Sequence, residues 1–188
     1  WLLEVIKVDG FRIDAAKHFV EQGPVQEDTV ASRRWMAEFT DFVHRVDPTA
    51  LVLGEVWSAS AVTARYVPDA LDLVFDFDFG QEGLSAALQT GLAGPVAEAL
   101  EEVAASYLPG RAATFLTNHD MARVWTAVAE GAPPDMVGPI ARLLATVLLT
   151  APGTPFVYYG EEVGLAGGKP DERIRTPMPW TGEGPGVG

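Results

Sequence analysis

Short apolar runs alternate along the chain with longer segments that are typical of helices. Five runs predict strands, at residues 8–14, 51–56, 71–77, 113–117 and 154–159. The segments around them predict a first helix that is capped by Thr29 or Ser32 and runs to about residue 46, and further helices at residues 58–65, 81–89, 95–107, 121–129 and 136–150. An alternation of strands and helices predicts a parallel sheet with helical crossovers, which is an α/β fold.

Local signals refine several of these elements. Asp47-Pro48 predicts the end of the first long helix, because the residue before a proline disfavours helical backbone. The run at 51–56 is continuously apolar, as in a strand covered on both faces. The helix at 136–150 is rich in Leu, Ala and Val and is expected to be largely buried. Residues 1–7 predict the tail of a helix, and the glycines and proline of residues 183–188 predict a loop.

Candidate chemistry begins in the first strand. Side chains alternate along a strand, so Arg12 and Asp14 share a face. An arginine beside a carboxylate keeps that carboxylate ionised and oriented. A nucleophilic carboxylate needs this at neutral pH. Taken alone, the pair is interpreted equally well as a structural ion pair at a strand end.

Two further acids stand at the ends of apolar runs. Glu55 follows Leu51–Gly54, and Asp120 follows the run that begins at residue 113. A parallel barrel builds its active site from residues at the ends of several different strands. Three acids at three strand ends therefore predict such a site.

Several segments resemble the α-amylase superfamily of glycoside hydrolases (glycoside hydrolase family 13). GFRIDAAKH at 10–18, GEVW at 54–57 and TNHD at 117–120 are similar to three of its signature segments, in the same order. YYGEEVGL at 158–165 and IRTPMPW at 174–180 resemble segments found in many members. Each motif is weak alone, but three in order are highly specific.

The resemblance implies a partial (β/α)8 TIM barrel. A complete barrel typically takes about 250 residues. Five strand–helix units in 188 residues resemble strands four to eight. Residues 1–188 are thus expected to be a single fragment of a catalytic barrel domain, without its first three strands and inserted small domain. The fragment alone is expected to be inactive.

The resemblance also assigns roles to the acids. Retaining glycosidases use two carboxyl groups about 5–5.5 Å apart. Asp14 takes the place of the nucleophile and Glu55 that of the acid/base, and Asp120 matches a third carboxylate that grips sugar hydroxyls and helps distort the ring. Desolvation favours the neutral form of a carboxyl group, which suits a proton donor. Two alternatives stay open: an ion-paired barrel-lining role for Glu55, and a helix N-cap for Asp120.

Sugar contacts are expected from residues beside the acids. The resemblance implies substrate-binding positions at Arg12, Lys17, His18 and His119. A structural role for His119, and solvent exposure for Lys17 and His18, remain alternatives. Trp57 is a candidate for stacking on a sugar, whereas packing within the barrel is the better interpretation of Tyr158 and Tyr159. Arg175 and Trp180 receive no role.

Cofactor chemistry is not required by the sequence. In many α-amylases the main-chain carbonyl at the position of His18 helps bind calcium, so the resemblance leaves calcium as an open option. No side chain is proposed as a metal ligand. The absence of cysteine excludes disulfides and thiolate zinc sites.

Composition limits the partners. The net charge of −13 argues against nucleic acid and anionic membranes. No apolar run reaches the roughly 18 residues of a membrane span. A soluble protein is expected, cytoplasmic or secreted, with its oligomeric state undetermined.

The preferred function is hydrolysis of α-glucosidic bonds in starch, maltodextrin or related oligosaccharides through a covalent glycosyl-enzyme. The alternatives are a transglycosylase or isomerase of the trehalose-synthase or glucanotransferase type, or an oligo-1,6-glucosidase. A non-catalytic barrel is disfavoured, because Asp14, Glu55 and Asp120 are all present.

Overall fold

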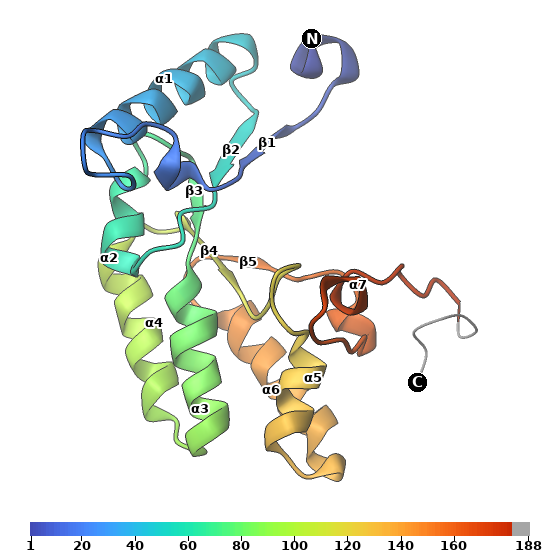
Figure 1. Cartoon of the computed structure of the whole chain (residues 1–188). Helices are drawn as coiled ribbons and strands as arrows, with labels where there is room; N and C mark the ends of the chain where they lie inside the picture. The colour runs from blue at the N-terminus through green and yellow to red at the C-terminus, as the bar shows by residue number, and fades with distance from the viewer. Residues whose placement is uncertain (182–188) are drawn as a thin grey trace. The chain divides into compact units, whose positions relative to one another are not determined.

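The protein is a strand-and-helix structure built around one sheet. A computed structural model describes residues 1–181, so the loop predicted at 183–188 lies outside the described residues. The strands are β1 (Gly10–Ile13), β2 (Leu51–Gly54), β3 (Leu73–Phe75), β4 (Ala112–Phe115) and β5 (Thr154–Phe156). They follow one another in the sheet in the order β1-β2-β3-β4-β5 (Figure 1).

Helices and single helical turns separate the strands, as predicted. The helices are α1 (Val30–Val46), α2 (Ser60–Thr63), α3 (Ser85–Thr90), α4 (Gly94–Ser106), α5 (Val124–Gly131), α6 (Val137–Thr150) and α7 (Asp171–Ile174). The short turns are η1 (Leu2–Ile6), η2 (Ala16–His18), η3 (Ala64–Tyr66), η4 (Phe79–Leu84), η5 (Pro134–Met136) and η6 (Glu161–Val163). The predicted alternation of strands and helices is confirmed.

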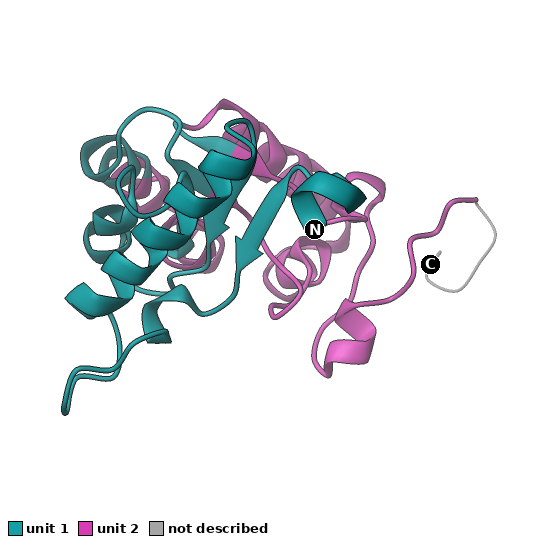
Figure 2. Cartoon of the chain, turned by 90° about the horizontal axis from the view of Figure 1, so that it is seen from above, with its two compact units in different colours: residues 1–78, 100–113, 152–154 teal, residues 79–99, 114–151, 155–188 magenta. Residues whose placement is uncertain are grey.

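The chain divides into two compact units, coloured separately in Figure 2. Unit 1 holds Trp1–Asp78, Leu100–Ala113 and Pro152–Thr154. Unit 2 holds Phe79–Ala99, Thr114–Ala151 and the chain from Pro155 onward.

The pairing of β1 with β2 positions the first two candidate acids in unit 1. The two strands are parallel, and Ile13 at the end of β1 stands opposite Gly54 at the end of β2. The next residues along the two strands are Asp14 and Glu55, so the register brings both acids to the same edge of the sheet. A side chain at Gly10 would collide with the main-chain oxygen of Leu51, which explains a glycine at the start of β1.

Helix α1 packs on β1 in the same unit. Thr29 caps the helix, because its hydroxyl oxygen accepts a hydrogen bond from the main-chain N–H of Ser32 at 2.9 Å. The helix ends at Val46, directly before Asp47-Pro48, as predicted. Its Phe39 ring lies edge-on to the ring of Phe11, with centroids 5.9 Å apart. The loop between β1 and α1 is therefore anchored at both ends.

Helices α5 and α6 lie side by side in unit 2 (Figure 1). Val128 of α5 and Leu148 of α6 are fully buried. The prediction that residues 136–150 are largely buried is nevertheless wrong, because Leu143 and Leu149 are each 60% exposed. One stripe of α6 is covered within the described residues, although the helix is apolar on more than one face.

The start of α5 also differs from the sequence prediction. Residues 121–123 were expected to be helical, but α5 begins at Val124 with Arg123 in the cap position. The main-chain N–H of Arg123 donates instead to the carbonyl oxygen of Gly167 at 2.8 Å. The side-chain oxygen of Asn118 accepts a hydrogen bond from the N–H of Asp120 at 2.9 Å, which forms a local turn. These bonds keep the segment before α5 out of the helix.

All five strands are shorter than the predicted runs, because the pairing ends where each strand passes into its loop. The run at 71–77, for example, is a strand only at Leu73–Phe75 and leads into η4 from Phe79. Between residues 1 and 181, no helix is both long and apolar enough to cross a membrane.

Candidate active site

Arg12 links the first two candidate acids. Its Nη1 contacts Oδ1 of Asp14, and its Nη2 contacts Oε2 of Glu55. One planar guanidinium group thus holds both carboxyl groups, a geometry that arginine achieves and lysine does not. The contact between Arg12 and Asp14 follows from the side-chain alternation in β1. The contact with Glu55 follows from the register of β1 and β2.

The two acids differ in exposure. The Asp14 side chain is 75% exposed, whereas that of Glu55 is 13% exposed. The backbone of Glu55 is fixed on both sides: its N–H donates to Ile13 O at 2.9 Å, and its carbonyl accepts from the N–H of Ala16 at 2.8 Å. One acid is therefore open to solvent while the other is rigid and shielded.

A cavity of about 460 Å³ opens beside Glu55 in unit 1. It is lined by Ala15, Lys17, His18, Glu55 and Trp57. Three of these residues follow β1 and two follow β2, so the cavity has one wall from each segment. It is large enough for a small polar ligand beside the shielded acid.

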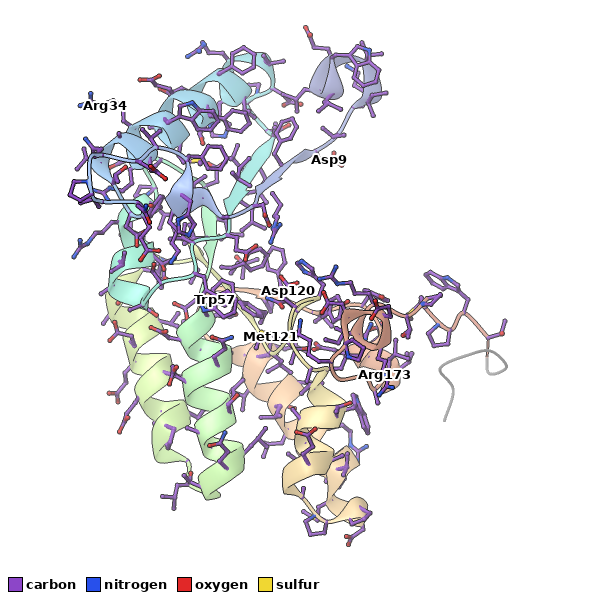
Figure 3. The ribbon with its side chains drawn as sticks, in the orientation of Figure 1. Asp9, Arg34, Trp57, Asp120, Met121 and Arg173 are labelled. Carbon is purple, nitrogen blue, oxygen red and sulfur yellow. The ribbon has the colours of Figure 1, made fainter. Side chains whose placement is uncertain are left out.

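Trp57 presents an aromatic surface on one wall of this cavity. Its ring is stacked on that of Phe77, with centroids 4.8 Å apart and the planes 8° from parallel. The side chain, labelled in Figure 3, remains 47% exposed. Stacking on Phe77 fixes one face of the indole ring.

Lys17 and His18 both lie near Glu27. The Lys17 ammonium is 2.8 Å from Oε2 of Glu27, and Nε2 of His18 is 3.7 Å from the same oxygen. The hydrogen bond from Lys17 holds the pKa of Glu27 below its usual range. Lys17 therefore has an anionic partner on its own loop. Glu27 was not predicted as part of the site, because no local motif marks it.

The third candidate acid belongs to unit 2, in the loop after β4 (Figure 3). Oδ1 of Asp120 is 2.6 Å from Nη2 of Arg175, and its Oδ2 is 3.2 Å from Nε2 of His119. Arg175 also donates to the main-chain oxygen of His119 at 3.0 Å. Asp120 is not the N-cap of α5, so that alternative is removed. Arg175, which received no role from its motif, is instead the cationic partner of this acid.

Tyr158 and Tyr159 pack against Arg123 in unit 2. The fully buried Arg123 guanidinium carbon lies 4.4 Å and 4.7 Å from the two ring centroids. Arg123 also donates to the main-chain oxygens of Tyr159 and Ile174, at 2.6 Å and 2.8 Å. These contacts agree with the packing interpretation of both tyrosines.

All of these residues lie within the part of the chain that matches a known protein family. The family model described as "Alpha amylase, catalytic domain" matches residues 1–186. The chain belongs to the α-amylase catalytic-domain family.

Curated relatives and solved structures agree with this membership. The chain is similar to Alpha-amylase 3 of Dictyoglomus thermophilum, with 35% identity over 93% of this chain and 33% of the relative. It is similar to a 4-alpha-glucanotransferase of Thermotoga neapolitana, with 30% identity over 93% of this chain and 36% of the relative. The crystal structure of an α-amylase from H. orenii matches with a TM-score of 0.78 and 29% identity, over 95% of this chain and 35% of that chain.

The chain thus spans about a third of the length of the curated relatives that it matches. Its five parallel strands and alternating helices form a partial (β/α)8 barrel of the α-amylase type. The expected fold class and family are both confirmed. The roles assigned to Asp14, Glu55, Asp120, Arg12, Lys17, His18 and His119 stay predictions.

Calcium is the metal that the α-amylase resemblance left open. Calcium takes six to eight oxygen ligands, mostly from carboxylates and carbonyls. Among residues 1–181, no group of three or more acidic or histidine side chains is arranged to hold a metal ion. The main-chain oxygen of His18 alone does not make such a site.

Glu161, in the YYGEEVGL segment, is a buried acid that sequence reasoning missed. Its Oε1 accepts a hydrogen bond from the hydroxyl of Thr117, and its main-chain oxygen accepts one from the Trp125 indole at 3.1 Å. Burial raises the pKa of its carboxyl group to about 7, although the Thr117 hydrogen bond and the charge of Arg123 oppose this. The sequence GEE does not indicate which glutamate is buried, because burial depends on contacts within unit 2.

Folding stability is expected to depend on the protonation of Glu161. The pKa is raised in the folded state, so the folded protein binds this proton more tightly than the unfolded chain does. This contribution is complete below the unfolded value of 4.5 and is lost as the pH rises through about 7. Glu161→Gln stays neutral, so it should flatten the decline in urea stability between about pH 5 and pH 8. Glu172→Gln, an exposed acid on α7, is the matched control and should retain the decline; an equal decline in both variants contradicts the assignment.

Proposed function

We propose that this chain carries the acid/base and nucleophile of a retaining α-glucan hydrolase. One observation supports this more than any other: a single guanidinium group, that of Arg12, contacts both Asp14 and Glu55 beside a cavity. Two carboxyl groups held this closely suit double displacement. Inverting enzymes need a wider separation, which leaves room for a water molecule.

Asp14 acts as the nucleophile. Contact with the guanidinium orients its carboxylate, and its exposure leaves the carboxylate accessible to an anomeric carbon. Attack by Asp14 forms a covalent glycosyl-enzyme and breaks the bond to the leaving oxygen. Water later attacks the same carbon and releases Asp14.

Glu55 acts as the general acid and then as the general base. It first gives a proton to the leaving oxygen and then takes one from the attacking water. Its main-chain N–H and carbonyl are both hydrogen-bonded, so the backbone position from which the side chain extends is fixed. The ion-paired alternative for Glu55 remains compatible with this role, because Arg12 can orient both acids at once.

The cavity beside Glu55 binds the sugar on the leaving side. Trp57 offers an aromatic face to a sugar ring, and Lys17 and His18 offer donors to its hydroxyls. In unit 2, Asp120 and His119 supply an acceptor and a donor suited to sugar hydroxyls. Arg175 binds Oδ1 of Asp120, and the other oxygen, Oδ2, lies next to Nε2 of His119.

Transfer to a second sugar is the other candidate function. A relative at 30% identity is named a 4-alpha-glucanotransferase, and the covalent intermediate is the same in both reactions. A transferase must keep water away from that intermediate until the acceptor sugar arrives.

Product analysis tests the proposal. The whole polypeptide that carries these residues should convert maltooligosaccharides to shorter sugars in which new reducing ends accumulate. Longer products without a net gain of reducing ends would indicate transfer instead. Residues 1–188 made alone should show little or no turnover, because positioning and distortion of the substrate supply much of the rate. No change in either sugar length or reducing ends with the whole polypeptide would contradict a glucan-active enzyme.

A further inference from the structure

Asp28 connects two segments of unit 1 that are far apart in the sequence. It lies at the end of the loop between η2 and α1, next to the capping residue Thr29. Its carboxylate accepts a hydrogen bond from the hydroxyl of Ser58 at 3.0 Å and another from the hydroxyl of Tyr66 at 3.1 Å. Both donors follow β2, so the side chain of Asp28 is bound to the segment that carries Trp57.

The backbone of Asp28 is bound to the other segment. Its N–H donates to the carbonyl oxygen of Lys17 at 2.9 Å, and its own carbonyl accepts from Nη1 of Arg33 at the same distance. Its φ angle is 53°, in the left-handed region that aspartate tolerates better than most residues. This conformation lets one residue bind Lys17 through its backbone and Ser58 through its side chain.

These two segments are the two walls of the cavity beside Glu55. Ala15, Lys17 and His18 form one wall, and Glu55 and Trp57 form the other. Near the strand ends the walls are joined by the hydrogen bond from Ala16 to Glu55. Farther along both segments they are joined by Asp28.

We propose that Asp28 is a positioning residue that sets the spacing of the two walls and thereby selects the sugar bound on the leaving side. The inference rests on the proposed function. It adds that recognition of the leaving-side sugar depends on a residue outside the three acids and outside the GFRIDAAKH and GEVW segments. Asp28 acts through Lys17 and Trp57, not by touching the reacting atoms.

Tyr66 is suited to hold this link at neutral pH. The side chain is fully buried, and burial together with the negative charge of Asp28 raises the pKa of the phenol above its usual value. The hydroxyl therefore keeps its proton and stays a donor to Asp28. The positive charge of Arg33, whose guanidinium carbon is 5.9 Å from the centre of the Tyr66 ring, offsets only part of this rise in the pKa.

Asp28→Gly is the most informative variant. Glycine adopts a positive φ without strain, so the backbone bonds to Lys17 and Arg33 are retained while the carboxylate is removed. Asp28→Asn is the conservative variant, because asparagine also tolerates this conformation and keeps one acceptor oxygen. Glu21→Gln, at an exposed acid on the same loop, is the matched control.

The two substrates to compare are a maltooligosaccharide and α-glucosyl fluoride, measured with the whole polypeptide. The fluoride leaving group is too small to need the cavity, whereas a maltooligosaccharide fills it. Asp28→Gly should raise KM for the maltooligosaccharide roughly tenfold, as expected from the loss of hydrogen bonds to a charged group, and should leave kcat/KM for the fluoride nearly unchanged. Asp28→Asn should recover part of the loss, and Glu21→Gln should match the parent. Equal losses on both substrates, or no loss on either, would overturn the proposal.

Hydrogen exchange tests the same link without turnover. Asp28→Gly should accelerate exchange of amides in residues 15–20 and in residues 57–66, compared with the parent and with Glu21→Gln. Unchanged exchange in both segments would overturn the positioning role, even in an active enzyme. If the parent cleaves neither substrate, the proposed function fails, and faster exchange in both segments would still support Asp28 as the link between the walls.

Discussion

Replacing Asp14 by asparagine should lower kcat/KM by roughly 10⁴-fold or more, as for other nucleophiles that form a covalent intermediate. An amide of nearly the same size cannot attack an anomeric carbon. The Arg12 guanidinium would still contact Glu55, so the sheet edge should keep its structure. The comparison is kcat/KM on maltooligosaccharides, with thermal unfolding measured in parallel.

Asp9→Asn provides the matched control for this variant. Asp9 is exposed and precedes β1, whereas Asp14 follows it, and it is labelled in Figure 3. The same chemical change at Asp9 should leave turnover close to that of the parent. Near-normal activity in Asp14→Asn would remove Asp14 from the mechanism. If Asp14→Asn loses both its activity and its folded state, trapping of the glycosyl-enzyme tests the role of Asp14 instead.

Replacing Glu55 by glutamine should impair substrates according to their leaving group. General acid catalysis typically contributes about 10²–10⁴-fold, so maltooligosaccharide cleavage should fall by that amount. An activated aryl α-glycoside needs little protonation of its leaving oxygen, so its first step should suffer much less. Burst kinetics with the aryl substrate separate this first step from the later attack of water.

An exposed acid on α1 gives the control for Glu55. Glu38→Gln removes a charge from the same unit without touching Arg12 or the cavity, and it should leave both substrates unaffected. Equal losses on the maltooligosaccharide and on the aryl glycoside in Glu55→Gln would contradict the acid role and favour a purely structural ion pair with Arg12.

Much of the fold follows from local sequence signals. The end of α1 could be predicted because Pro48 stops the helix, and its cap was predicted as Thr29 or Ser32, of which the structure has Thr29. The order of strands and helices could be predicted because each strand is a short apolar run followed by a longer segment. The contact between Arg12 and Asp14 needs only the alternation of side chains along one strand.

Other features depend on contacts between distant segments. The contact of Arg12 with Glu55 requires the register of β1 with β2, which no local pattern specifies. The start of α5 was predicted too early because the bond from Arg123 to Gly167 joins residues more than forty positions apart. Asp28 received no role from the sequence, since its bonds to Ser58 and Tyr66 are visible only once β2 is placed.

The anomeric form of the first-formed sugar tests the central claim most directly. Double displacement at Asp14 inverts the anomeric carbon twice, so the initial product keeps the α configuration. Proton NMR of the whole polypeptide acting on a maltooligosaccharide, recorded before mutarotation, distinguishes the two anomers. An initial α-anomer is the predicted result. An initial β-anomer would show a single displacement by water and would contradict the assignment of Asp14 as nucleophile.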